Sequence, residues 1–207
     1  GAKDAAKLQA SNQDFADLTD LVRITNPGKS EASVVVQVIG ATASTFGTVV
    51  QAKVAANSTI DLPISGLSDG DYAIFIQSSR DVLAAAKLNR TGLASKQITD
   101  FAWLPAVDSS GGERTFVVPK VGISKLALAN GTKDSVSFTI TLGGATTAHT
   151  LKTGSTSTFL VEPGSTVRLA ADGQLAASVV VDVDFAVAVL PMLEQRNLGG
   201  EVGVLVR

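Results

Sequence analysis

The stretch LVRITNPGKSEASVVVQVIG, residues 21–40, decides the fold that we expect for this chain. Val22 and Ile24 fall on one face of a strand predicted over residues 19–25, because side chains alternate along a β-strand. The segment Asn26-Pro27-Gly28-Lys29 suits a type II turn, since proline fixes φ and glycine accepts a positive φ. The valine-rich run at 34–39 is apolar on nearly every position, which predicts a second, central strand.

The rest of the chain repeats this pattern of short apolar runs separated by turn residues. About seven runs at spacings of roughly 8–12 residues precede residue 107, which is the signature of a β-sandwich. Similar runs follow in the second half, where Asp172-Gly173 predicts a turn and Leu175–Val189 predicts two strands or one bent strand. The predicted fold class is therefore all-β, with two consecutive immunoglobulin-like or fibronectin-like antiparallel sandwiches.

Composition shifts divide the chain into four parts. Residues 1–18, rich in Ala, Asp, Gln and Lys, predict an N-terminal arm or a short helix, and residues 19–107 form the first sandwich. The polar, glycine-rich run at 108–114 has no hydrophobic period and is interpreted as a linker. Residues 115–207 form the second sandwich, with a short closing strand predicted over Val202–Val206.

The second half contains a diverged copy of the opening stretch. Asn26–Gly40 matches Asn130–Gly144 with an offset of 104, so that the apolar positions of the strand coincide. Near the end of each half, Asp100-Phe101-Ala102 matches Asp184-Phe185-Ala186 with an offset of 84, and Leu-Pro follows both. This agreement favours a duplicated sandwich, in which the second copy has lost about twenty residues from loops. Convergence of unrelated sandwiches on one pattern is the alternative.

Composition also excludes several classes of function. The hydrophobic fraction of 45% is ample for a packed core, so disorder is not expected. The net charge is −2 and the basic residues are scattered, which argues against nucleic-acid binding. The sequence has no apolar run of 18 residues and no signal-peptide pattern, so no membrane span is predicted within it. Because it has no cysteine, disulfides and thiolate chemistry are excluded.

The acidic and histidine residues give little support to catalysis. His149 is the only histidine and lies in an exposed-looking strand, without the nucleophile motif that a triad needs. Asp182 and Asp184 share one face of a strand, but the alternation VVVDVDF explains them as solvated residues opposite buried ones. A calcium or partner contact is the weaker alternative. Asp69 and Asp71 flank a glycine and are interpreted as turn residues. We expect no catalytic residue, no metal and no cofactor.

Trp103 and Tyr72 are the only residues of their kinds. Carbohydrate-binding sandwiches present exposed aromatic rings for stacking, whereas a lone tryptophan more often fills a core or a domain interface. We therefore expect Trp103 to be a packing residue. Candidate partner or ligand contacts, should there be a binding face, are Trp103, Tyr72, Asp182 and Asp184.

Four segments of the first half carry a resemblance to a known family: LVRITNPG at 21–28, SGLSDGDY at 65–72, DVLAAAKL at 81–88 and DFAWLPA at 100–106. They resemble a group of exported actinobacterial proteins of unknown function that are built from tandem β-sandwich modules. The likeness is fainter over 120–195, where the proline of the turn and the tryptophan are missing. The resemblance implies an extracellular or cell-envelope module, and it implies no enzyme, substrate or ligand.

These observations together predict a non-catalytic extracellular or cell-surface module with a structural or protein-interaction role. Its partner would be an unidentified protein or another component of the cell envelope. A carbohydrate-binding or adhesin module, with a glycan as partner, is the alternative function, and an enzyme is a distant third.

Overall fold

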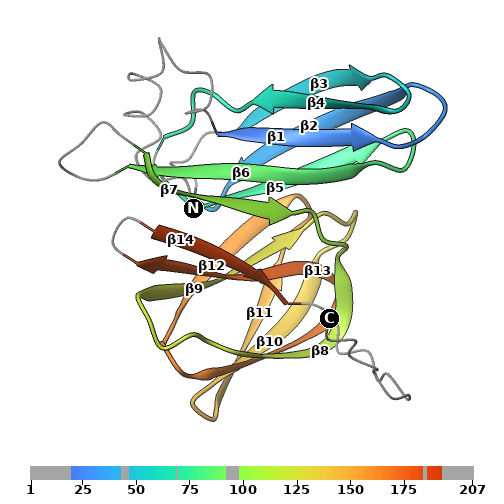
Figure 1. Ribbon diagram of the computed structural model, residues 1–207. Helices are drawn as coiled ribbons and strands as arrows, with labels where there is room; N and C mark the ends of the chain where they lie inside the picture. The colour runs from blue at the N-terminus through green and yellow to red at the C-terminus, as the bar shows by residue number, and fades with distance from the viewer. Residues whose placement is uncertain (1–19, 43–46, 69, 92–97, 184–185, 193–207) are drawn as a thin grey trace, which may run out of the picture.

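The computed structural model of the chain describes residues 20–42, 47–68, 70–91, 98–183 and 186–192, and these form antiparallel β-sheets (Figure 1). The all-β prediction is confirmed. None of the described residues forms a helix with the length and apolar character needed to cross a membrane. The arm or helix predicted over 1–18 and the strand predicted over 202–206 lie outside the described residues.

The first sandwich consists of two sheets with strand orders β4-β1-β6-β7 and β3-β2-β5. Its core lies between them, where Val22 and Ile24 of β1 face Val34, Val36 and Val38 of β2. This is the burial that the alternation in the opening stretch predicts. The strands are β1 (Leu21–Asn26), β2 (Ala32–Gly40), β3 (Thr48–Val54), β4 (Ser58–Pro63), β5 (Tyr72–Ser78), β6 (Leu83–Thr91) and β7 (Ile98–Pro105).

The second sandwich has its own core, around Leu126, Leu128, Phe138 and Leu169. The long strand β13 runs through both layers: its first part pairs with β10 and β8, and its second part pairs with β9 and β14. The strands are β8 (Ser110–Val117), β9 (Ile123–Asn130), β10 (Val136–Leu142), β11 (Ala145–Leu151), β12 (Ser155–Val161), β13 (Thr166–Val183) and β14 (Ala186–Pro191).

Two local predictions differ from the structure around β13. Asp172 and Gly173 were expected to form a turn, but they lie inside β13, at an irregularity in its pairing with β8 between Ala171 and Leu175. A bulge lets one strand bend from one sheet into the other without a turn. The run 108–114, predicted as a linker, enters β8 at Ser110 and supplies the partner that keeps β13 extended there.

The two sandwiches have corresponding strand orders. Strands β1, β2, β3, β4 and β7 correspond to β9, β10, β11, β12 and β14, and the two parts of β13 correspond to β5 and β6. Ala86 pairs with Val22 and Leu104, and Val179 pairs with Leu126 and Leu190. This register aligns Leu104 with Leu190, so the offset at the end is 86 and not 84.

The corrected register changes which residues of the second half correspond to the aromatic residues of β7. Counting back from Leu104 and Leu190, Trp103 corresponds to Val189 and Phe101 corresponds to Val187. The match of Asp100-Phe101-Ala102 with Asp184-Phe185-Ala186 is therefore two residues out of register. The β-strand period of two preserves the faces under such a slip, which explains why the sequence pattern alone did not detect it.

Each sandwich contains a fully buried asparagine that holds neighbouring segments together, Asn26 at the end of β1 and Asn130 at the end of β9. The Nδ2 group of Asn26 donates hydrogen bonds to the carbonyls of Ser30 and Val54, at 2.8 and 3.0 Å. Nδ2 of Asn130 donates to the carbonyls of Asp134 and Leu151, at 2.8 and 2.9 Å. In both cases the side-chain oxygen accepts a backbone N–H two residues on, from Gly28 or Thr132. We call each arrangement the asparagine latch.

The second sandwich docks against the first through the outer face of its sheet β12-β9-β13-β14, at what we call the junction (Figure 1). Lys125 Nζ lies 2.7 Å from Asp71 Oδ2, and the backbone N–H of Val187 donates to Asp100 Oδ2 at 3.1 Å. A Cβ on Gly131 would lie 3.0 Å from the ring of Phe75, so glycine permits this close approach.

Candidate functional site

The outer face of the sheet β4-β1-β6-β7 exposes two aromatic rings. Phe101 and Trp103 project from the same side of β7 and are 53% and 38% exposed. Trp103 therefore does not fill a core, which was one of the two packing roles expected for it, although its strand β7 contacts β14 of the second sandwich. We call the surface formed by Arg23, Asp61, Lys87, Phe101 and Trp103 the aromatic face.

Strand pairing places charged groups beside these rings. Arg23 lies opposite Asp61, and Lys87 lies opposite Trp103. The Arg23 guanidinium lies 4.9 Å from the Trp103 ring centroid, and the Lys87 ammonium lies 5.6 Å from that of Phe101. Both distances are within the range of a cation–π interaction.

Arg23 is held in place by a bidentate ion pair. Its Nε and Nη2 groups donate to the two carboxylate oxygens of Asp61, each at 2.7 Å. The hydrogen bond from Arg23 is the main cause that lowers the pKa of Asp61, and burial opposes it. Because both side chains are exposed to solvent, the pair fixes the orientation of the guanidinium more than it stabilises the fold.

Part of the corresponding face of the second sandwich is covered by the junction. Val187 and Val189 occupy the positions of Phe101 and Trp103, and Ala127 and Val180 occupy those of Arg23 and Lys87. All four are buried or partly buried, and Val187 is only 6% exposed although it belongs to neither core cluster. These four positions are thus covered in the second sandwich, although Ile123 and Leu160 on the same face stay exposed, and the corresponding positions of the first sandwich are open.

Tyr72 does not belong to the aromatic face. Its ring packs against the core of the first sandwich, and its hydroxyl donates to the Ser68 carbonyl at 2.8 Å. Because its ring is packed and its hydroxyl is hydrogen-bonded within the protein, Tyr72 presents little free surface to a ligand. Of the two aromatic candidates from the sequence, the structure supports Trp103.

The acidic candidates do not form a site in the described residues. Asp182 lies on β13 opposite Ile123 and Val187, on the outer side of the sheet as the alternation predicts, but it is half-buried there and not fully solvated. Asp184 lies outside the described residues. Asp71 is used in the junction: burial alone would raise its pKa, but interactions that include the hydrogen bond from Lys125 outweigh this and lower it.

His149 lies on the edge strand β11 and packs more closely than its sequence suggested. Its ring stacks on Phe138, with 5.4 Å between centroids, and meets Phe159 edge to face at 4.9 Å. Its Nε2 atom is 2.9 Å from the hydroxyl of Thr147. These contacts make His149 part of the packing at the sandwich edge.

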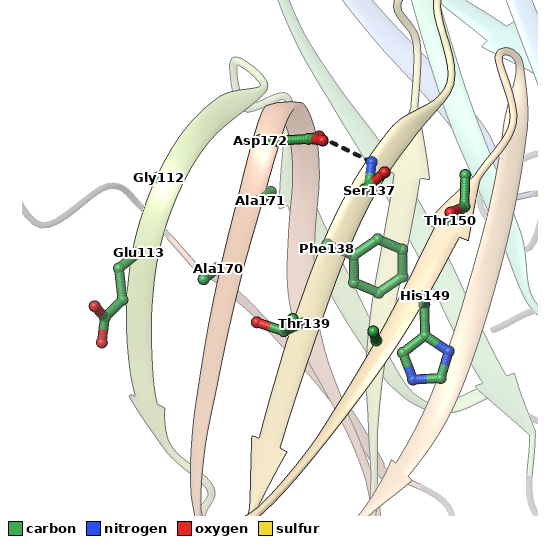
Figure 2. Close-up of a pocket in the computed structure, with 11 residues that line it drawn as sticks. Gly112, Glu113, Ser137, Phe138, Thr139, His149, Thr150, Ala170, Ala171 and Asp172 are labelled. Atoms are coloured by element: carbon green, nitrogen blue, oxygen red, sulfur yellow. Dashed lines mark hydrogen bonds between the residues drawn. The ribbon is translucent and has the colours of Figure 1, made fainter.

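An open depression lies over the outer side of the strands β8, β13, β10 and β11 (Figure 2). The Asp172 carboxylate accepts a hydrogen bond from the backbone N–H of Ser137 at 2.8 Å. Figure 2 shows that Glu113 and Thr150 lie at opposite sides of this surface and do not point toward a common centre. In the parts of the chain that the structure describes, no three His, Asp or Glu side chains are grouped as a metal site requires.

Sequence reasoning missed four residues whose roles the structure shows. Asn26 and Asn130 were interpreted only as turn residues. Each lies the same number of residues before the strand that matches in the other half, and this agreement could have indicated a shared structural role. Phe101 was considered only as part of the repeated segment Asp100-Phe101-Ala102. Arg114 of β8 is 1% exposed and donates to the Leu175 carbonyl at 2.9 Å, and nothing in its polar sequence surroundings indicated burial.

The fold and the aromatic face define this chain as a pair of docked β-sandwiches with one open, ring-bearing sheet surface. The sequence profile of DUF5719, a family of unknown function, matches residues 16–172, and the chain belongs to that family. The match covers the whole first sandwich and extends to the bulge of β13. Comparison with curated proteins and comparison with solved structures both find no match.

Proposed function

We propose that the chain is a non-catalytic module of the cell surface or the extracellular space, which acts as a rigid two-sandwich scaffold for interactions. The observation that carries this proposal is the junction, where charge, backbone and packing contacts join the sandwiches. The resemblance to exported proteins built from tandem modules supports the location and a duplicated, immunoglobulin-like origin. The corresponding strand orders and the two asparagine latches support the duplication.

Rigidity follows from the chemistry of the junction. Lys125 and Asp71 are each partly shielded from solvent, with 39% and 23% of their side chains exposed, so their attraction is screened less than that of a surface pair. Val187 adds buried apolar area, and Gly131 allows the Phe75 ring to come close. Linked domains with small polar contacts usually move relative to each other, whereas apolar contacts restrict such motion.

Spin-label distances test the scaffold. The chain has no cysteine, so Gln51→Cys and Thr147→Cys place one label on an exposed strand position of each sandwich. We expect one narrow distance distribution, which broadens when Lys125→Ala and Val187→Ala are added. A broad distribution in the otherwise unaltered chain would contradict a rigid scaffold. Val117→Ala, at an exposed position of β8, serves as the matched control and should leave the distribution narrow.

Protease accessibility in cells that express the natural gene tests the location. We expect external protease to digest the protein on intact cells, or the protein to accumulate in the medium. Protection on intact cells, with digestion only after lysis, would refute the extracellular proposal and leave the rigidity result untouched.

A further inference from the structure

We propose that the aromatic face binds a polysaccharide chain, with sugar rings stacked on Phe101 and Trp103. This site is a further function, independent of whether the two sandwiches act as a rigid scaffold. Both rings are substantially exposed, although their strand β7 contacts β14 of the second sandwich at the junction.

The second sandwich shows which side chains this fold uses at the same positions for contact with protein. There, Ala127, Val180, Val187 and Val189 are small and aliphatic, and they lie on the side of the sheet that carries the junction. The cores of protein interfaces are depleted of lysine, aspartate and glutamate, although aromatic residues and arginine are common in them. The open face has a cation beside each aromatic ring, and one of these cations, Arg23, also forms an ion pair with Asp61. A protein partner that covered this face would have to remove water from these charges.

A sugar ring has the complementary chemistry. Its ring face carries C–H groups that pack on an aromatic ring, while its rim carries hydroxyls that need hydrogen-bond partners. Phe101 and Trp103 supply the stacking surfaces, since large rings provide apolar area with little entropy to lose. Arg23 has five N–H donors, of which Asp61 engages two and also fixes their direction.

The spacing of the rings indicates a chain and not a single small molecule. Residues two apart on a strand have Cα atoms about 7 Å apart, so Phe101 and Trp103 form a short row along β7. Small molecules bind in concave pockets that enclose most of their surface. An open row on a flat sheet instead favours an extended polymer, which gains affinity from successive sugar units.

A nucleic-acid strand could also stack on exposed rings, but the charges here disfavour it. The aromatic face carries two cations and one carboxylate, and the whole chain has a net charge of −2. Affinity for nucleic acid depends mainly on the number of phosphates that the protein neutralises. Uncharged hydroxyl-rich chains need no such excess of positive charge.

The single tryptophan makes the test direct. The intact chain is titrated with a panel of soluble polysaccharides, namely glucans, galactans, mannans and uronic-acid-containing chains, while Trp103 emission is followed. We expect at least one to shift the emission and to protect Trp103 from quenching by acrylamide. For that polysaccharide, affinity electrophoresis should show a loss of about tenfold or more in Phe101→Ala and in Trp103→Ala, because each removes a stacking surface.

Controls separate loss of binding from loss of folding. Leu160→Ala removes an exposed side chain of similar apolar character from the second sandwich and should bind as the unaltered chain does. Trp103→Phe, which keeps a ring, should retain most of the affinity. The proposal is overturned if no polysaccharide of the panel binds, or if Phe101→Ala and Trp103→Ala bind normally. It is also overturned if the rings mediate binding only to a single-stranded oligonucleotide or self-association in sedimentation.

Discussion

The first and second sandwiches share their strand order and their asparagine latch, yet they use the same outer face in different ways. In the second sandwich the face carries Val187 and Val189 and lies against the first. In the first it carries Phe101 and Trp103 and is open. The inner residues thus preserve the fold, and the outer residues of the same strands determine what the face contacts. The four tests that follow examine this difference, beginning with the largest expected effect.

The asparagine latch should matter equally in both sandwiches. Asn26→Ala and Asn130→Ala each leave buried carbonyls and a backbone N–H without partners, so we expect each to lower the free energy of unfolding by about 3 kcal/mol. Urea unfolding measures the loss. Lys29→Ala and Lys133→Ala, exposed residues of the same two turns, are the controls. A large loss of unfolding free energy in one variant and a negligible loss in the other would show that the two asparagine latches are not equivalent.

The corresponding positions 101 and 187 should respond in opposite ways to truncation. Val187→Ala removes buried methyl groups at the junction and should lower the free energy of unfolding by about 1.5 kcal/mol. Phe101→Ala removes a larger side chain, but from an exposed surface, and should change stability by less than about 0.5 kcal/mol. Thermal and urea unfolding of both variants decide the point, and equal losses would mean that the first face is also covered.

The junction should weaken in acid. The pKa of Asp71 is lower in the folded chain than its ordinary value of 3.8, so its contribution to stability is present above that value. This contribution is lost as the pH falls through the lower folded pKa, and solvent screening keeps it modest. We expect unfolding midpoints measured between pH 6 and about pH 2.5 to decline less steeply in Asp71→Asn than in the unaltered chain. Parallel declines would show that the pair with Lys125 adds no pH dependence.

The smallest effect concerns Arg23. Arg23→Ala should leave stability almost unchanged, because its ion pair with Asp61 is exposed. It should nevertheless raise the acrylamide quenching of Trp103, since the guanidinium covers part of that ring. Lys53→Ala, which removes another exposed ion pair, provides the reference for unspecific change. Unchanged quenching would argue that the cation does not shield the ring in solution.

The strands with one buried face could be predicted from the sequence, because alternation records burial directly. Val22 and Ile24 show this, as do Val136 and Phe138 in the second half. Asp172-Gly173 misled the prediction, since turn residues also occur in a bulge, and only the pairing with β8 distinguishes the two. The exposure of Trp103 could not be predicted either: alternation assigns a residue to a face, but it does not show whether another domain covers that face.

The asparagine latches also imply a difference in how the two sandwiches age. Asparagine loses its side-chain amide when the next backbone nitrogen attacks it, and Asn26 precedes a proline whose nitrogen is fully substituted. Asn130 precedes Gly131, which leaves the attack open once the latch is released. The resulting aspartate could not donate to the Leu151 carbonyl, so a chain that spends time unfolded should refold its first sandwich and fail to close its second. Mass spectrometry of protein held in urea, followed by dilution and urea unfolding, would detect both events.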